Sequence, residues 1–452
     1  MSTEKTNNKK PKNEKIPIKK TKKQKERIAI VTALRTPMAR AGGKFAKMQA
    51  DQLGARLFRE LMLRSPVSFE EVDEVIIGNV AQPIHAANIA RVIALRAGFP
   101  EATPSLTVHR NCASGMESIT TAASRIHSGE GKIYVCGGVE SMSNIPLVYS
   151  ASMTALFTKL SRSKTVLDKV QTLLGFRPSF LKPIVGLMSG LTDPVSGLLM
   201  GNTAEVLAQD FGISREEQDA FALASHEKAA KAKESGRFAK ESMALVYDER
   251  AGKYLDFDDG IRESQTLEKL GKLRPFFDRK NGTVTAGNSS QITDAAAGVV
   301  LMSESEAQKR KLEPLGYLTD YAYEGLEPKR MGLGPVFATE KLFRQTGFCM
   351  KDMQIVEINE AFAAQVIACE RAFASKEFAK THFAKKEAVG AIDPEILNVN
   401  GGSIALGHPV GMTGTRLVLT VLHELRERGL QRGLATLCIG GGQGAALLLE
   451  VE

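Results

Sequence analysis

Apolar runs of strand length alternate along this chain with stretches of helical periodicity. In the first third, four such runs predict strands at 27–32, 72–80, 106–110 and 132–138. The last of them is expected to end in a glycine turn at Gly137-Gly138. A helix is expected from about Cys112 to His127, since four apolar residues fall on one of its faces, namely Ile119, Ala122, Ala123 and Ile126.

The second half of the chain repeats part of this pattern. The run 352–358 resembles 72–77, and 435–441 resembles 134–138, where a strand ending in cysteine precedes glycines. These matches indicate an internal duplication of one α/β unit. Because strands alternate with helices, we expect an α/β fold of layered sheets covered by helices.

Helical patterns dominate the stretch between the halves, about 146–292. A capping box at Ser214–Glu217 predicts a helix to about Lys233. Within this stretch, segment 144–199 combines apolar residues with six basic residues against two acidic ones. Basic amphipathic helices of this kind lie on membranes or dock on partner proteins. The alternative is a lid helix packed on its own domain, and the sequence does not choose.

Charge is concentrated at the N-terminus. Residues 1–27 contribute +8 of the net charge of +9, so the body offers no basic patch for nucleic acid. The tail 1–26 lacks an apolar core typical of a secretory signal, and its composition predicts a disordered basic tail. It is interpreted as a solvating arm, or alternatively as a polybasic arm touching anionic lipid or RNA. No apolar run is long enough to span a bilayer.

The five cysteines have no paired metal spacing, and reduced thiols in a cytoplasmic compartment are expected. Cys112 stands in Asn-Cys-Ala-Ser-Gly-Met at an expected helix start. There, free N–H groups and the positive end of the helix dipole favour a thiolate, which a free thiol of pKa about 8.5 scarcely forms at neutral pH. The alternative for Cys112 alone is a buried structural cysteine.

Two further motifs favour the reactive interpretation. His408 lies in a glycine-rich run, Asn398 to Gly414, and could act as general base or oxyanion donor. Cys438 precedes Gly440-Gly-Gly, whose backbone N–H groups could hold an oxyanion, while the thiol could carry a proton at carbon. Structural or surface roles are expected for the remaining cysteines and histidines, namely Cys136, Cys349, Cys369, His85, His109, His127, His226, His382 and His423.

Together these residues resemble the thiolase family from Arg27 to Glu452. The resemblance rests on six motifs in order: 111–116 around Cys112, 137–143, 282–290, Asn-Glu-Ala-Phe at 359–362, Gly-His-Pro at 407–409 and 438–442. It implies a thiolase fold with duplicated α/β halves in a five-layer αβαβα core and an inserted, mainly helical loop domain. The expected boundaries are 28–145 plus 293–312 for the N-terminal half, 146–292 for the loop domain and 313–452 for the C-terminal half.

The resemblance also implies roles for single residues. Cys112 would be the acylated nucleophile, His408 its activator, and Cys438 the group that moves a proton at the α-carbon. Asn359 would hold a water for one oxyanion, and Cys112 and Gly440 would form a second oxyanion hole with their N–H groups. Coenzyme A, as a substrate, would contact positions that match the family's binding loop, namely Arg262, Phe277, Ala286 and Ser290, and Met200 would line the acyl site. No metal or redox cofactor is implied.

The sequence combines features that resemble two branches of the thiolase family. Asn359 and the Cys438 motif resemble short-chain acetoacetyl-CoA thiolases, but Leu199 stands where those have histidine. Segment 144–199 and the stretch 373–392 resemble the β-subunit of the fatty-acid trifunctional complex. We therefore expect 3-ketoacyl-CoA thiolysis in β-oxidation, the alternatives being acetoacetyl-CoA synthesis or a non-catalytic acyl-CoA-binding or membrane scaffold. Expected partners are further copies in a dimer or tetramer, and a membrane surface or a hydratase/dehydrogenase α-type subunit.

Overall fold

The computed structural model describes residues 26–452, so the prediction for the tail 1–25 lies outside the described residues. Ten strands form one sheet. Its order is β12 (Ile355–Ile358), β13 (Arg432–Ile439), β14 (Gln443–Glu450), β11 (Gly316–Gly325), β1 (Ile28–Arg35), β10 (Thr293–Ser303), β5 (Ile133–Ser141), β3 (Glu74–Gly78) and β4 (Ser105–Val108), with β2 (Ala39–Arg40) beside β10. Strand β1 joins the halves, since it pairs with β10 along its length and with β11 over Ile28–Ile30.

The two halves of the sheet repeat one arrangement. In the N-terminal half, β3 runs parallel to β5, and β5 runs antiparallel to β10. In the C-terminal half, β12 runs parallel to β13, and β13 runs antiparallel to β14. A parallel bridge between Val356 and Leu397 takes the place that β4 holds beside β3. The duplication expected from the sequence is therefore present in the structure.

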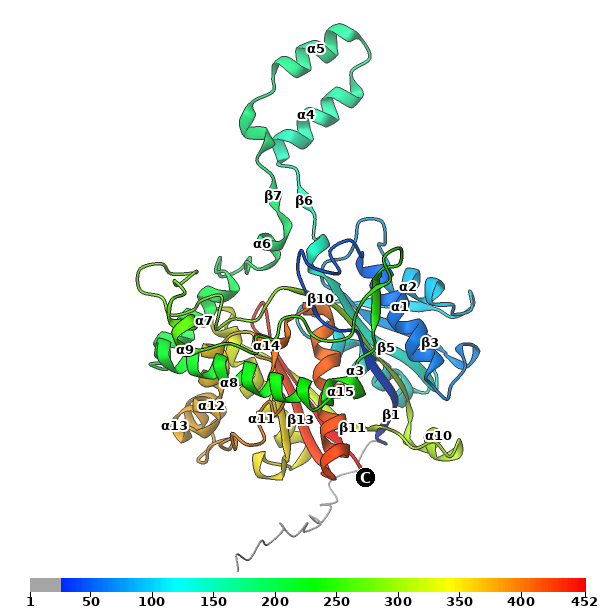
Figure 1. Cartoon of the computed structure of the whole chain (residues 1–452), viewed down its shortest axis with the longest axis vertical. Coiled ribbons are helices and arrows are strands. Elements are labelled where there is room, and N and C mark those ends of the chain that lie inside the picture. Colours follow the sequence, from blue (N-terminus) through cyan, green and yellow to red (C-terminus); the bar gives the residue numbers. More distant parts are fainter. Residues whose placement is uncertain (1–25) are drawn as a thin grey trace, which may run out of the picture.

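The two halves of the sheet form two layers, and helices form three more, which makes five. Helices α1 (Ala50–Leu63) and α2 (Ile89–Ala97) cover the outer face of the N-terminal strands, and α11 (Gly334–Thr346) and α12 (Ala363–Ala374) lie on the C-terminal half. Helices α3 (Ser114–Ser128) and α15 (Val410–Arg428) pack against each other between the halves, where their apolar residues share one core with both sets of strands. The expected αβαβα layering is confirmed (Figure 1).

The chain between β5 and β10 is mainly helical, as expected. Its longest helix, α8 (Arg215–Glu234), begins with the predicted capping box, in which Ser214 and Glu217 each accept the other's backbone N–H. The shorter elements of this stretch are α7 (Met200–Asp210), η4 (Arg237–Lys240), β8 (Leu245–Asp248), β9 (Lys253–Leu255) and α9 (Leu267–Gly271). Elsewhere lie η1 (Phe69–Glu71), η2 (Met142–Asn144), α10 (Glu304–Lys309), η5 (Pro328–Leu333), η6 (Met350–Asp352), α13 (Lys376–Phe383) and α14 (Ser403–Leu406).

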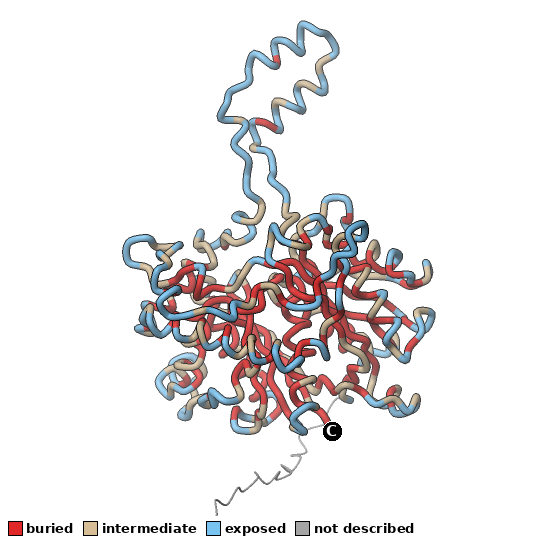
Figure 2. The backbone as a smooth tube through the Cα atoms, in the orientation of Figure 1, coloured by how far each residue is buried: buried red, intermediate tan, exposed pale blue. Residues whose placement is uncertain are grey.

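Residues 145–191 form an arm that projects from the body (Figure 1). A two-stranded stem of β6 (Leu147–Val148) and β7 (Ile184–Val185) carries α4 (Ala151–Arg162), α5 (Val166–Leu174) and η3 (Pro178–Leu181), and α6 (Gly186–Gly190) leads back to the body. Only Met153 of α4 and Thr172 of α5 are buried, and Figure 2 shows the arm exposed along its length. The alternative of a lid packed on its own domain is therefore wrong.

One predicted boundary is also wrong. Strand β5 does not end in a glycine turn but continues through Gly137 and Gly138 to Ser141. A Cβ at Gly137 would overlap the carbonyl oxygen of Ala297, and a Cβ at Gly138 would overlap that of Gly411. The glycines therefore allow neighbouring backbones to approach closely, and they serve this purpose within an extended strand.

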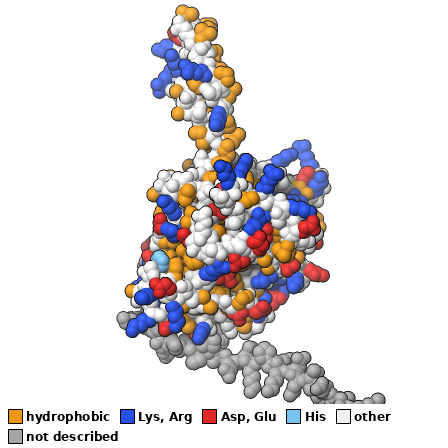
Figure 3. Space-filling view, turned by 90° about the vertical axis from the view of Figure 1, so that its left-hand side faces the viewer, with side chains coloured by type: hydrophobic (Ala, Val, Ile, Leu, Met, Phe, Trp, Pro, Cys, Tyr) orange, Lys and Arg blue, Asp and Glu red, His pale blue; other side chains and the backbone are white. Residues whose placement is uncertain are grey.

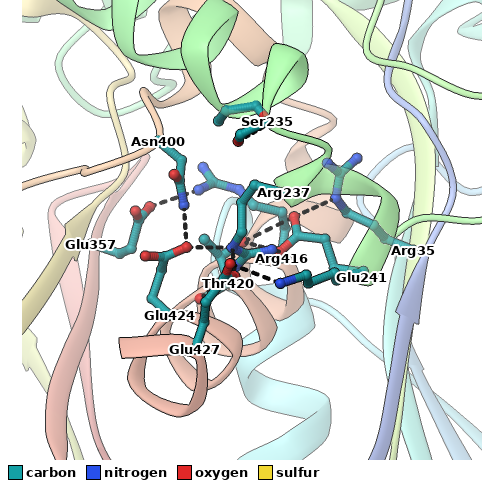
Figure 4. A network of polar contacts seen from close by, with 12 residues as sticks. Arg35, Ser235, Arg237, Glu241, Glu357, Asn400, Arg416, Thr420, Glu424 and Glu427 are labelled. Atoms are coloured by element: carbon teal, nitrogen blue, oxygen red, sulfur yellow. Dashed lines mark hydrogen bonds and ion pairs between the residues drawn. The ribbon is translucent and has the colours of Figure 1, made fainter. Parts of the chain in front are cut away.

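A buried ionic network ties the inserted stretch to both halves (Figure 4). Glu241 accepts from Arg35 of β1 at 2.8 Å and from Arg237 of η4 at 3.0 Å. Burial alone would raise the pKa of Glu241, but the two guanidinium groups hold it at about 2. Arg237 also pairs with Glu424 of α15. Because all these groups are buried, each charge depends on its partner.

Candidate active site

Cys112 lies in the loop between β4 and α3. The helix begins at Ser114, two residues after Cys112, and not at Cys112 itself as expected. The preceding residue, Asn111, has a φ of 43°, a left-handed conformation that asparagine tolerates better than most residues. This bend places the thiol beside the start of the helix rather than within it.

Glycines bring α3 and α15 into close contact near this loop. A Cβ at Gly115 of α3 would lie 2.5 Å from Oγ1 of Thr415, and a Cβ at Gly414 of α15 would lie 2.7 Å from the backbone nitrogen of Met116. The two helices therefore touch through backbone atoms close to their N-termini. Since Cys112 precedes one helix and His408 precedes the other, this contact brings their two loops to the same end of the central layer.

The turn after β13 meets the loop of Cys112. The side-chain amide of Asn111 donates to the carbonyl oxygen of Gly440 at 2.7 Å. Burial raises the pKa of the Cys112 thiol, while the backbone N–H groups of Gly440 and of Cys112 itself act to lower it. The expected depression of this pKa by the helix start is therefore wrong, because loss of water outweighs the two donors.

Cys438 is the second-last residue of β13 and is buried. Its pKa is raised well above the usual range, chiefly by burial and further by the proximity of Cys112. The two thiols and the Gly440 N–H group thus share one site, as the sequence predicted. Two protonated thiols in one buried site can serve as a nucleophile and as a proton carrier.

His408 is 7% exposed and has a defined tautomer. Thr413 Oγ1 donates to the carbonyl oxygen of Pro409 at 3.1 Å, so it must accept from Nδ1–H of His408, which lies 2.7 Å away. This leaves Nε2 as the unprotonated nitrogen. Burial, with a contribution from the charge of Arg416, lowers the pKa of His408 to about 3. The side chain is therefore a neutral imidazole that can accept a proton at Nε2.

Asn359 lies directly after β12, and its amide is oriented toward His408. Ser403 Oγ donates to Oδ1 of Asn359 at 2.6 Å, so Nδ2 is the atom that lies 3.5 Å from Nε2 of His408. Behind it, Arg416 donates to Ser403 at 3.2 Å and pairs with Glu357 at 2.8 Å. The structure therefore brings Asn359 and His408 together as predicted, with an N–H donor available beside the base.

Three of the five positions expected to contact coenzyme A or an acyl group lie around this centre. Met200 approaches Gly440, where a Cβ would lie 3.3 Å from its sulfur. The Phe277 ring packs on Gly201 and against Phe362. Ser290 N–H donates to the carbonyl oxygen of Ala361 at 3.0 Å.

The other two positions are exposed. Ala286 lies in the loop that ends at Ser290. Arg262 lies apart, with its backbone N–H donating to Nδ1 of His226 at 3.2 Å. Within residues 26–452, no hydrogen bond joins Arg262 to the other four.

Sequence reasoning missed the residues that hold the site in place. Thr413 fixes the histidine tautomer, Ser403 and Arg416 orient Asn359, and Glu140 accepts hydrogen bonds from the loop after β3 and from the first turn of α15. Thr413 lies only five residues after His408, so closeness in sequence was the one signal that could have indicated it. The other three carry no local signal, because their partners are distant in sequence. No group of three or more His, Cys, Asp or Glu side chains suited to a metal ion occurs among residues 26–452.

Comparison with known proteins identifies the family of this chain. Residues 28–305 match the family model "Thiolase, N-terminal domain", and residues 312–451 match "Thiolase, C-terminal domain". A 3-ketoacyl-CoA thiolase of Photorhabdus laumondii is 40% identical over 437 residues, covering 96% of this chain and 99% of that protein.

Solved structures agree as well. An acetyl-CoA acetyltransferase of Bacillus anthracis superposes with a TM-score of 0.82 at 37% identity, over 95% of this chain and all of that chain. The human mitochondrial 3-ketoacyl-CoA thiolase in complex with CoA superposes with a TM-score of 0.81 at 35% identity, over 94% of this chain and 98% of that one. On its fold, its site and these matches, the chain belongs to the thiolase family.

Proposed function

We propose that this protein is an acyl-CoA:acetyl-CoA C-acyltransferase that cleaves 3-ketoacyl-CoA with coenzyme A in fatty-acid β-oxidation. The observation that carries the proposal is the meeting of two thiols, the half-buried Cys112 and the buried Cys438, at the Gly440 turn. His408, a neutral imidazole whose Nε2 is unprotonated, lies before α15 at the same end of the central layer. One thiol can attack a carbonyl carbon, and the other can give its proton to the carbon released when the carbon–carbon bond breaks.

In the first half-reaction, Sγ of Cys112 attacks the 3-keto carbonyl carbon and Nε2 of His408 takes the thiol proton. The bond between C2 and C3 then breaks, its electron pair moves to C2, and Cys438 gives its proton to that carbon. Acetyl-CoA leaves, and the acyl group stays on Cys112 as a thioester. In the second half-reaction, Cys438 takes the proton of the coenzyme A thiol, whose sulfur attacks this thioester. Acyl-CoA leaves, and His408 returns its proton to Cys112.

Two donor sets would stabilise the oxyanions of these steps. The N–H groups of Cys112 and Gly440 both approach the sulfur, so an oxygen on the attacked carbon would lie near them. Nδ2 of Asn359 lies beside Nε2 of His408 and would hold a water for a thioester oxygen.

Coenzyme A would enter along the inserted stretch 146–292. Met200 and Phe277 line the approach to Gly440, Ala286 and Ser290 supply small surfaces for the pantetheine, and exposed Arg262 offers a charge for phosphate or adenine. Leu199 lies beside this approach instead of the histidine usual in short-chain relatives. This replacement supports a medium or broad chain-length range, while acetoacetyl-CoA synthesis through the same residues is the alternative.

A substrate panel tests the proposal. The protein is incubated with coenzyme A and 3-ketoacyl-CoA from C4 to C16, and loss of the 3-keto thioester is followed. Cleavage at several lengths, abolished in Cys112→Ala and retained in Cys136→Ala, is expected. Cleavage of the C4 substrate alone would refute the broad range, and no cleavage at any length would refute the activity.

We also propose that the protein is cytoplasmic and that its arm docks on an anionic membrane surface. The arm, residues 145–191, carries six basic side chains and one acidic one. Its exposed apolar side chains include Phe157, Leu167, Val170, Leu174, Phe176 and Leu181. Figure 3 shows cations gathered on one side of the arm and apolar groups along it. Each basic residue near an anionic surface contributes about 1 kcal/mol. No described helix is long and apolar enough to cross a membrane.

The stem allows a clean deletion for this test. Gly186 N–H donates to the carbonyl oxygen of Pro146 at 3.3 Å, so residues 147–185 can be replaced by a short Gly-Ser linker. Both forms are prepared without residues 1–25, which are basic themselves. We expect salt-sensitive sedimentation with phosphatidylglycerol vesicles for the intact arm only. Equal binding of both forms would refute the membrane role, and binding of a hydratase/dehydrogenase α-type subunit without lipid binding would replace it.

Assembly into a homo-oligomer, a dimer or tetramer, is likewise a proposal. The exposed edges of the β6–β7 stem and the apolar surface of the arm support it. Sedimentation of the intact and linker forms would give the oligomeric state and the contribution of the arm. A monomer at micromolar concentration would contradict the proposal.

A further inference from the structure

Glu140 is a fully buried carboxylate near the C-terminal end of β5, and it has no assigned role in the reaction above. Its Oε2 accepts from the backbone N–H groups of Val80 at 3.1 Å and Gly411 at 2.9 Å. Its Oε1 accepts from the N–H of Ala81 at 3.0 Å and from Nδ2 of Asn79 at 3.1 Å. One side chain thus holds the loop after β3 and the first turn of α15, which belong to different halves of the chain.

The backbones around Glu140 approach as closely as glycine permits. A Cβ at Gly411 would lie 2.7 Å from Oε2 of Glu140 and 2.8 Å from the carbonyl oxygen of Val139. Gly411 lies three residues after His408 and two before Thr413, which holds the imidazole. The position of the first turn of α15 relative to β5 therefore sets the position of the histidine.

Few charged groups surround this carboxylate. Within residues 26–452, no Lys, Arg or His side chain hydrogen-bonds to Glu140. On the neighbouring strand β10, Asp294 is turned toward Ser143, and the start of α15 contributes the neutral His408. On the α3 side, burial raises the pKa of the Cys112 thiol, and the charge of Glu140 adds to the rise. Burial raises the pKa of Glu140 to about 7 despite its four donors.

We propose that Glu140 is a positioning residue for the reaction, which holds the His408 turn of α15 against the N-terminal half. Its negative charge also opposes ionisation of Cys112. When ionised, it satisfies three backbone N–H groups that would otherwise be buried without a partner. When protonated, it loses acceptor capacity toward Gly411 and Val80. Glu140 therefore makes the geometry of the site depend on pH near neutrality.

Two substitutions separate the two effects. Glu140→Gln removes the charge and turns an NH₂ group toward N–H donors. Glu140→Asp keeps the charge but shortens the reach by one methylene. Asp73→Asn is the matched control, since Asp73 also accepts two backbone N–H groups, those of Lys132 and Ile133, at the opposite end of β3 and β5. Thermal unfolding of each variant checks that it folds.

The first readout does not require activity. Iodoacetamide alkylation of Cys112 is followed by peptide mass spectrometry from about pH 6 to pH 10. We expect Glu140→Gln to be alkylated roughly threefold faster at pH 8, because removing a nearby negative charge lowers the thiol pKa. Glu140→Asp and Asp73→Asn should match the wild type. An unchanged rate in a folded Glu140→Gln, or an equal rise in Asp73→Asn, would overturn the electrostatic part.

The second readout rests on the proposed thiolase activity. Both Glu140 variants should lose about tenfold in kcat with little change in the KM for coenzyme A, since the base is displaced while the binding surface stays intact. The wild type should show an acid limb near pH 7 in kcat that Glu140→Gln lacks. An unaltered kcat and pH profile would overturn the positioning role. An inactive wild type would refute the proposed function and leave the alkylation result to judge Glu140.

Discussion

The amide of Asn111 donates to the carbonyl oxygen of Gly440 at 2.7 Å, across a separation of 329 residues. This bond joins the loop of the nucleophile to the turn that carries the candidate oxyanion donor. Asn111 reaches it from a left-handed backbone conformation, with φ at 43°. One residue thus supplies both the bend before Cys112 and the tie between the two halves.

Loss of this tie should lower activity without unfolding the protein. We expect Asn111→Ala to reduce kcat about tenfold, since a displacement of the thiol from its donors costs about 1.4 kcal/mol in the transition state. Asn111→Gly keeps the left-handed backbone and removes only the amide, so a similar loss in both variants identifies the hydrogen bond. Normal kcat in Asn111→Gly would show that the backbone bend alone suffices.

Thr413 should be essential for the tautomer of His408. In Thr413→Val, Nδ1–H loses its acceptor and the proton is free to move to Nε2, the atom that must accept from Cys112. We expect kcat to fall about a hundredfold, a typical contribution of a general base. Thr413→Ser retains the oxygen and serves as the control. Equal rates of both variants in the thiolysis assay would contradict the tautomer assignment.

The buried histidine predicts a loss of stability in acid. The unfolded chain binds a proton at His408 below a pH of about 6.5, whereas the native side chain stays neutral until about pH 3. Because the unfolded state binds more protons in this window, the free energy of unfolding decreases as the pH falls through it. His408→Gln should weaken the decrease measured by chemical denaturation between pH 6.5 and pH 4. An unchanged slope would contradict a neutral buried imidazole.

The contact between α3 and α15 should tolerate no side chain. Gly115→Ala places a methyl group 2.5 Å from Thr415 Oγ1, and we expect it to destabilise the fold by about 1–3 kcal/mol. Gly190→Ala is the control, since a Cβ there meets no atom within 4 Å. Thermal unfolding should separate the two, and a Gly115→Ala protein as stable as wild type would refute the close contact.

The sequence predicted the parts of this molecule that depend on local pattern. The first strand, the capping box of α8 and the duplicated strands β3 and β12 lie where apolar runs and turn residues placed them. Cys112, His408, Cys438 and Asn359 were found because each sits in a short motif. These residues required no knowledge of distant contacts.

The remaining features depend on contacts that no local pattern records. Gly137 and Gly138 were predicted to form a turn, yet they lie in a strand. Glycine is needed there because the carbonyl oxygens of Ala297 and Gly411 leave no room for a Cβ. The pKa of Cys112 was expected to be lowered by a helix start, and burial raises it instead. The partners of Glu140 come from residues at separations of 59 to 271 positions.

The central claim is that Cys112 carries the acyl group, and intact-protein mass spectrometry tests it most directly. The protein is mixed with a 3-ketoacyl-CoA in the absence of coenzyme A, quenched in acid and weighed, with Cys112→Ala and Cys438→Ala treated alike. We predict one acyl group per wild-type chain, located on the Cys112 peptide and released by added coenzyme A, and none on Cys112→Ala. An acyl group on another residue, or turnover without any acylated protein, would contradict the account.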